Sequence, residues 1–196
     1  MVSQLLKADA GSSGKIAPQR APLLHVRSLD DLGWSPASSL LLAKKYTDWL
    51  LDPGSLTARL QQHTNTLSLQ LLTAGWQPKD QDKSRQLIRQ VLLSDGERPW
   101  IWGLTQVDAC QLQKEPELLN WSTQPLGQLL FTEDQSNIRC FDIADFATSA
   151  EFCQMLPRWG CVRTQPLWGR RCELQFRSCR LLLTEVFLPE HPMYGV

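Results

Sequence analysis

The spacing of hydrophobic residues predicts two short helices early in the chain. Apolar residues recur at helical spacing over residues 35–50, and the segment 52–54 (DPG) ends this run. Ser35 and Pro36 open it, and proline is favoured in the first turn of a helix. A second run follows over 55–60, with a serine at its start that can cap the helix. Each helix has an apolar face that needs a sheet to cover.

From there onward the hydrophobic period changes to two. Leu67, Leu69 and Leu71 alternate with polar residues, which predicts a strand that is exposed on one face. The runs 85–93 and 99–107 are joined by a loop that contains Asp-Gly, and this pattern predicts a hairpin.

The remaining segments extend this pattern. We expect a turn over 74–84, a strand over 138–143 and a final hairpin made of 168–176 and 181–188. The segment 147–166 is expected to form a helix and a loop on one face of the sheet. Because helices come first and hairpins follow, the sequence predicts an α+β fold with a single, mostly antiparallel sheet and helices packed on it.

Two tryptophans in the second strand of the first hairpin bear on packing. Trp100 and Trp102 are two residues apart, so alternation places both on one face, against a helix. We expect the eight tryptophans of the chain to serve mainly in packing.

Composition and charge limit the classes of function. Residues 1–28 are rich in small and polar residues and are expected to form a flexible extension to one domain over 29–196. The formal net charge is zero and no basic stripe occurs, which argues against nucleic acid as a partner. No apolar run approaches the roughly 20 residues of a membrane span, and no export signal is evident, so we expect a cytoplasmic protein. Without a heptad pattern or an apolar stripe, we expect a monomer.

The sequence gives no sign of a metal or cofactor site. Six cysteines include no CxxC pair, and the three histidines lie far from them. A glycine-rich phosphate loop and a G-x-S-x-G motif are also absent from the sequence. We therefore expect no bound metal.

Glu185 is an unusual residue for its position in the last predicted strand. Alternation places it on a face with Leu181, Leu183 and Phe187, and the opposite face is apolar as well. Burying an unpaired carboxylate costs several kcal/mol. Glu185 is therefore a candidate site residue whose partner should lie elsewhere in the chain.

Arg89 is a second charged residue in an apolar run. It falls on the face with Leu87, Val91 and Leu93, and its planar guanidinium group suits a carboxylate. Two interpretations stay open. Arg89 and Glu185 form a structural ion pair across the sheet, or both line one pocket in which Arg89 holds an anionic ligand and Glu185 contacts its uncharged end.

Several motifs together resemble the chorismate pyruvate-lyase family. They keep the order of the family, and the last two are the most specific. The motifs are 49–52 (WLLD) with 55–57 (SLT), 88–93 (IRQVLL) with 95–96 (DG) and 99–100 (PW), 125–127 (PLG) with 130–132 (LFT), 167–171 (LWGRR), and 181–185 (LLLTE) with 187–189 (FLP).

This resemblance implies a fold, an activity and a set of site residues. The family has a single antiparallel sheet and converts chorismate into 4-hydroxybenzoate and pyruvate, toward ubiquinone, without a cofactor. Arg89 matches the arginine that holds the ring carboxylate, and Glu185 matches the glutamate at the hydroxyl end. Leu126 matches a leucine that contacts the ligand. Leu56 stands where relatives carry methionine, a mild change in an apolar wall.

The resemblance leaves several alternatives open. Arg170 or Arg171 could bind a second carboxylate, or both could lie on a solvated strand face. Glu185 could act as a base at C4, or only orient the ring during a concerted shift. The alternative function is a non-catalytic module that binds a small aromatic acid, as in effector-binding domains of the same fold.

Overall fold

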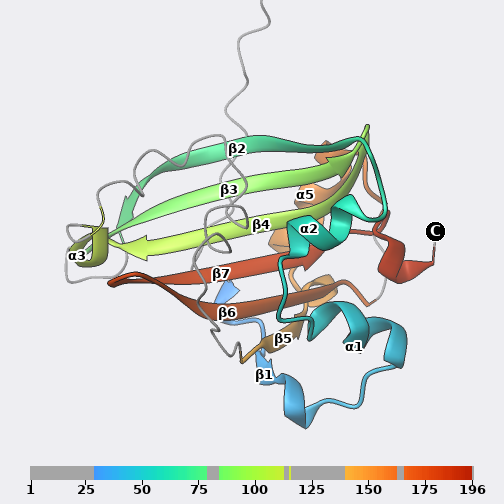
Figure 1. The fold of residues 1–196 in the computed structure, drawn as a ribbon, viewed down its shortest axis with the longest axis horizontal. Coiled ribbons are helices and arrows are strands. Elements are labelled where there is room, and N and C mark those ends of the chain that lie inside the picture. The colour runs from blue at the N-terminus through green and yellow to red at the C-terminus, as the bar shows by residue number, and fades with distance from the viewer. Residues whose placement is uncertain (1–28, 79–83, 113–114, 116–139, 163–165, 196) are drawn as a thin grey trace, which may run out of the picture.

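One antiparallel sheet forms the centre of the molecule (Figure 1). The computed structural model describes residues 29–78, 84–112, 115, 140–162 and 166–195. Within these residues the sheet has seven strands in the order β1-β5-β6-β7-β4-β3-β2, and every neighbouring pair is antiparallel. The strands are β1 (Ser35–Pro36), β2 (Leu67–Pro78), β3 (Arg85–Asp95), β4 (Arg98–Asp108), β5 (Asp142–Asp145), β6 (Trp168–Phe176) and β7 (Cys179–Phe187).

Helices cover both faces of this sheet, so the predicted α+β class is confirmed. In Figure 1, α1 and α2 lie on the near side of the sheet and α5 lies behind it. The α-helices are α1 (Lys44–Leu50), α2 (Leu56–Gln61), α3 (Ala109–Leu112) and α5 (Ala150–Met155). Short 3-10 turns complete the set: η2 (Ala37–Ser39), η4 (Phe146–Thr148), η5 (Leu156–Trp159) and η6 (Pro192–Tyr194).

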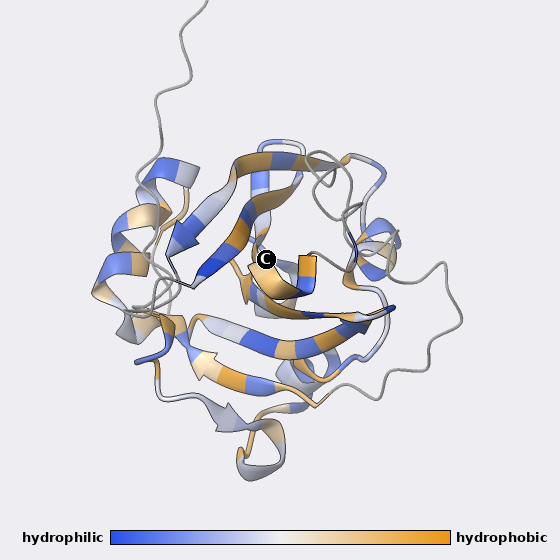
Figure 2. Ribbon diagram, turned by 90° about the vertical axis from the view of Figure 1, so that its left-hand side faces the viewer, coloured by the Kyte–Doolittle hydropathy of each residue, from blue (hydrophilic) through white to orange (hydrophobic). Residues whose placement is uncertain are grey.

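The alternation of residues along the strands divides the core into two halves. Hydrophobic and hydrophilic residues alternate along several strands in Figure 2. We call one side of the sheet the α1/α2 face, where Trp49, Leu50, Leu56 and Leu60 of the two helices pack with strand residues such as Ile101. The other side is the α5 face, whose core is formed by Ile88, Trp102, Leu104, Phe146, Phe152, Val186 and others.

The first predicted helix was wrong in its N-terminal part. Ser35 and Pro36 form the edge strand β1 and pair with Ile143 and Asp142 of β5. Proline lacks a backbone donor, and an edge strand tolerates that loss. The helix begins only at Lys44, and Ser55 caps α2 as predicted by accepting a hydrogen bond from the backbone N–H of Ala58.

The turn predicted over 74–84 was also partly wrong. β2 continues to Pro78 and pairs with β3 along its whole length, with a bulge between Leu71 and Thr73. Because β2 is an edge strand, its Gly75 and Pro78 do not interrupt pairing. Of the strand predicted over 138–143, residues 138–139 lie outside the described residues, and β5 runs from Asp142 to Asp145.

Both hairpins are confirmed, but one tryptophan assignment was wrong. Trp100 belongs to the core of the α1/α2 face and Trp102 to that of the α5 face. The register of β3 and β4 shifts between Leu93 and Ser94, at the level of Trp100. This bulge inserts one residue and separates the faces of the two rings.

Candidate active site

Arg89 is a buried cation in the middle of the sheet. It lies in β3 on the α1/α2 face and is 6% exposed. Its neighbours on the adjacent strands are Ala74 of β2 and Thr105 of β4, both small residues. Burial lowers the pKa of Arg89 from its ordinary value, because it disfavours the charged form. An anionic ligand at this position would offset that cost.

Glu185 lies in β7 on the same face, and its ion-pair partner is Arg170. The Nε of Arg170 donates to Oε2 of Glu185 over 2.7 Å, and the two residues are direct partners in the register of β6 and β7. The side chain of Glu185 is 14% exposed. The structure therefore gives Glu185 a different ion-pair partner from the one considered in the sequence analysis.

Arg89 and Glu185 are separated by β4. Arg89 is opposite Thr105, and Glu185 is opposite Gly103. The two charged residues are therefore offset by two residues along the strand direction. Strand spacing and rise place their Cα atoms about 12 Å apart. The two residues are therefore one strand apart and are not direct partners in the register of the sheet.

Gly103 lies in β4, between the strands of the two charged residues. Because it has no side chain, the surface of the sheet stays low there, and we call this surface the floor. A Cβ added there would lie 3.1 Å from Cγ2 of Val91, closer than ordinary van der Waals contact. Glycine inside a central strand is typical of a place where a ligand or another chain segment approaches closely. Thr105, which is 5% exposed, continues the floor toward Arg89.

Arg170 is the most deeply buried charged residue in the described part of the chain, at 1% exposure. Its Nη1 donates to three backbone carbonyls at the end of α1: those of Trp49 at 2.9 Å, Asp52 at 3.0 Å and Leu50 at 3.4 Å. Cations are favoured at a helix C-terminus. Its guanidinium carbon also lies 4.6 Å from the centre of the Phe141 ring.

The two arginines of the LWGRR motif therefore have different surroundings. Arg171 pairs with Thr184, so its side chain is on the α5 face, where its guanidinium carbon lies 4.4 Å from the ring centre of Trp34. Its Nε is 3.3 Å from Oδ2 of Asp142. A common solvated face for both arginines is wrong, because consecutive strand residues point to opposite faces.

Two leucines, Leu56 and Leu126, were predicted to line the site, and the structure describes only Leu56. Leu56 is the first residue of α2, is 7% exposed and belongs to the core of the α1/α2 face. It is thus on the same side of the sheet as Arg89 and Glu185. Leu126 lies outside the described residues.

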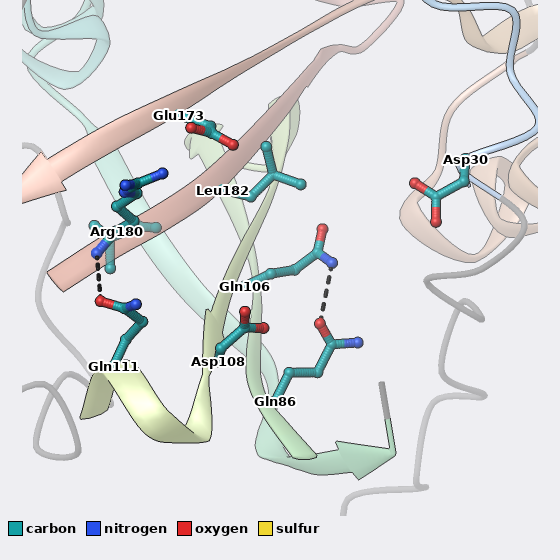
Figure 3. A pocket seen from close by; sticks show the side chains of 9 residues that line it. Asp30, Gln86, Gln106, Asp108, Gln111, Glu173, Arg180 and Leu182 are labelled. Atoms are coloured by element: carbon teal, nitrogen blue, oxygen red, sulfur yellow. Dashed lines mark hydrogen bonds between the residues drawn. The ribbon is translucent and has the colours of Figure 1, made fainter. Parts of the chain in front are cut away.

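A polar pocket of about 470 Å³ lies elsewhere (Figure 3). Gln86, Gln106 and Leu182 point from the α5 face of β3, β4 and β7 toward it, and neither Arg89 nor Glu185 lines it. The side-chain amide of Gln106 donates to that of Gln86 over 3.3 Å. The other lining residues are Asp30, Asp108, Gln111, Glu173, Arg180 and Leu181.

Among the described residues, no group of three or more His, Cys, Asp and Glu side chains is arranged to hold a metal ion. None of the described helices is long and apolar enough to cross a membrane.

Sequence reasoning missed the contribution of three residues. The link from Arg170 to Glu185 could have been found by counting back from a two-residue turn at Arg177 and Ser178, which sets the register of the last hairpin. Gly103 carried a weaker signal, as a glycine within a strand pattern. Thr105 carried none, because the bulge in the first hairpin decides which residue is opposite Arg89.

Comparison with known proteins agrees with the motifs. The family model described as chorismate lyase matches residues 28–195, and the chain belongs to this family. The chorismate pyruvate-lyase of Pectobacterium carotovorum is 32% identical over 85% of this chain and 89% of its own length. That of Serratia proteamaculans is 28% identical over 85% of this chain and 91% of its own length.

Solved structures similar to this chain include one described as the ligand-binding domain of a GntR-family transcriptional regulator from Bordetella bronchiseptica. It covers 65% of this chain and 89% of its own, with a TM-score of 0.46 and 14% identity.

Proposed function

We propose that this protein converts chorismate into 4-hydroxybenzoate and pyruvate, the step that leads toward ubiquinone. Membership of the chorismate lyase family supports the reaction. The observation that carries the proposal is the arrangement of Arg89 and Glu185 on one face of the sheet, at the two ends of a low floor formed by Gly103 and Thr105. This arrangement suits a flat ring with an anionic end and a hydroxyl end.

We assign Arg89 to the ring carboxylate. A guanidinium group can bind a carboxylate through two parallel hydrogen bonds, and it does so most strongly away from water. Arg89 is 6% exposed, and its strand neighbours Ala74 and Thr105 are both small residues. The arginine would fix one end of the substrate.

We assign Glu185 to the hydroxyl group at C4. One of its oxygens accepts from Arg170, which leaves the other carboxylate oxygen to accept from a ligand hydroxyl. Leu56 supplies an apolar wall over the ring, and Leu126 is proposed to contact the ligand as well. The pocket thus orients the ring from both ends.

The reaction needs only bond rearrangement within the substrate. The C3–O bond of the enolpyruvyl ether breaks, the hydrogen at C4 is lost, and the methylene carbon of the leaving group gains a proton to give pyruvate. The proton can pass through Glu185 as a base, or move directly from C4 to the methylene carbon in a six-membered transition state. In either route, fixing the ether above the ring lowers the entropic part of the barrier. No cofactor is required, and we propose none.

The proposal also includes the location of the protein, its oligomeric state and its partners. Chorismate is a dianion that does not cross a bilayer unaided, so a cytoplasmic enzyme would act where the substrate is made. A monomer is proposed because the exposed large hydrophobic residues of the described chain, Leu41, Leu51, Trp76 and Val162, are scattered over different segments. Chorismate and 4-hydroxybenzoate are its proposed partners, with no nucleic acid.

The alternative of a non-catalytic module for aromatic acids makes a different prediction. One preparation should be tested both for binding of 4-hydroxybenzoate by titration and for release of pyruvate from chorismate. Binding together with catalytic turnover supports the lyase. Tight binding with no pyruvate above the uncatalysed rate would support the module instead.

A further inference from the structure

The guanidinium group of Arg170 connects two parts of the molecule that are far apart in the sequence. Its Nε donates to Glu185 on β7, and its Nη1 donates to the carbonyls of Trp49 and Asp52 at the end of α1. A single planar group therefore fixes the carboxylate relative to the α1–α2 segment. The same segment leads directly to Leu56 at the start of α2.

The α1–α2 segment is itself held in place by Arg59. Its Nη1 donates to Oδ2 of Asp52 over 2.8 Å, and also to the backbone carbonyl of Asp48. The guanidinium carbon of Arg59 lies 3.8 Å from the ring centre of Trp49. The carbonyls that accept from Arg170 thus belong to a turn that Arg59 holds in place. The position of Arg170 is therefore fixed by this turn as well as by Glu185.

We propose that Arg170 is a positioning residue for the lyase reaction, holding the carboxylate of Glu185 in the orientation that the ring hydroxyl requires. This inference rests on the proposed function. Arg170 is 1% exposed, and all of its described polar contacts are with Glu185 and the end of α1. It therefore acts through Glu185 and not as a binder of the second substrate carboxylate.

The proposal makes a specific kinetic prediction. A carboxylate without this partner would rotate or move by a fraction of an ångström, and misplacement by about 1 Å can cost about 100-fold in rate. We expect Arg170→Met to lower kcat about 30-fold and to change KM for chorismate less than about 3-fold, because Arg89 still holds the ring carboxylate. Arg170→Lys keeps the charge and should recover part of the loss.

A double-mutant cycle separates positioning from general stability. In the Glu185→Ala background there is no carboxylate to orient, so Arg170→Met should lower kcat by less than about 3-fold. Equal losses in the two backgrounds would overturn the proposal. So would a folded Arg170→Met variant whose kcat stays within 3-fold of the unsubstituted protein.

A matched control is available in the neighbouring residue. Arg171→Met removes a guanidinium group from the same strand that also has an ion pair and an aromatic contact, but on the α5 face. It should keep kcat within about 2-fold. Thermal unfolding of each variant shows whether it is folded. If Arg170→Met does not fold, Arg170→Lys is compared with the unsubstituted protein in its place. A kcat of Arg170→Lys equal to that of the unsubstituted protein would then overturn the proposal.

The experiment also distinguishes the proposal from its premise. If the unsubstituted protein and Arg171→Met both fail to release pyruvate from chorismate, the proposed function itself is wrong, and the inference falls with it. If both are active and the variants of Arg170 are equally active, only the positioning role is wrong.

Discussion

Arg89 and Glu185 lie on the same face of the sheet on opposite sides of β4, with Thr105 opposite the first and Gly103 opposite the second. The two side chains do not form an ion pair with each other, because Glu185 forms its ion pair with Arg170. A buried arginine and a partly buried glutamate at either end of a low floor form the site that we propose for a small ring with two different ends. The following predictions test this arrangement.

The first prediction concerns the anion-binding end. Arg89→Ala should weaken binding of 4-hydroxybenzoate by about 10- to 100-fold, because the loss of charge-assisted hydrogen bonding to a charged group costs roughly 1.5–3 kcal/mol in net terms. The neutral analogue 4-hydroxybenzamide should lose much less. Calorimetric titration measures both affinities.

Arg85 offers the matched control for this prediction. It lies at the exposed start of the same strand, with its guanidinium carbon 5.2 Å from the ring centre of Trp76. Arg85→Ala should leave both affinities unchanged. Equal weakening of the acid and the amide by Arg89→Ala would show that the arginine does not recognise the carboxylate.

The second prediction concerns the hydroxyl end. Glu185→Gln keeps the shape and an acceptor oxygen, so we expect kcat within about tenfold of the unsubstituted protein, whereas Glu185→Ala should lose about 100-fold through misorientation of the ring. Steady-state kinetics with chorismate measures both. Losses of similar size in the two variants would favour Glu185 as a base over a role in orientation alone.

The third prediction concerns the floor. Gly103→Ala places a Cβ 3.1 Å from Val91 and raises the floor between Arg89 and Glu185. One extra methyl group in a close-fitting pocket is worth about 1–3 kcal/mol, so we expect binding of 4-hydroxybenzoate to weaken by about tenfold. Gly75→Ala is the control, since a Cβ there has no atom within 4 Å. Unchanged affinity in Gly103→Ala would place the ligand away from β4.

The fourth prediction concerns pH and stability. His191 is fully buried among Trp49, Trp100 and Phe187, and its Nδ1 accepts from the backbone N–H of Met193. Burial is the main cause that lowers the pKa of His191 from 6.5 to about 3, and the nearby His63 and two arginines add to it. The unfolded chain therefore binds a proton that the folded protein does not bind between these two pH values.

This difference has a defined sign. The stabilising contribution is complete above pH 6.5 and is lost as pH falls from there toward 3, by at most about 1.4 kcal/mol per pH unit. His191→Asn keeps an acceptor for Met193 and does not titrate, so its free energy of unfolding should fall less between pH 7 and pH 5. Denaturant unfolding at the two pH values, with His63→Asn as control, measures this. The same pH dependence in His191→Asn would contradict the account.

Much of the fold followed from the hydrophobic pattern. Period-two alternation identified β3, β4, β6 and β7 and placed Arg89 and Glu185 on faces with apolar neighbours, and the structure puts both on the same face. The elements that were wrong contain proline or glycine. Pro36 and Pro78 are typical of helix starts and turns, but in this chain they lie in edge strands, where the missing donor costs little.

The candidate site was predicted less completely, for a physical reason. Register depends on turns and bulges, and the bulge near Trp100 shifts the residues of β4 from Ile101 onward by one position relative to β3. Without that shift, Thr105 and Gly103 would not be on the face of Arg89. The ion pair of Arg170 with Glu185, in contrast, follows from the regular register of a hairpin and could have been predicted from the sequence.

The most direct test of the central claim is to incubate the purified protein with chorismate and follow 4-hydroxybenzoate and pyruvate in the same samples, with Arg89→Ala and Arg85→Ala in parallel. The account predicts that the two products form in equal amounts, that Arg85→Ala retains this activity and that Arg89→Ala loses most of it. An unsubstituted protein that releases neither product, or an Arg89→Ala variant as active as Arg85→Ala, would contradict the account.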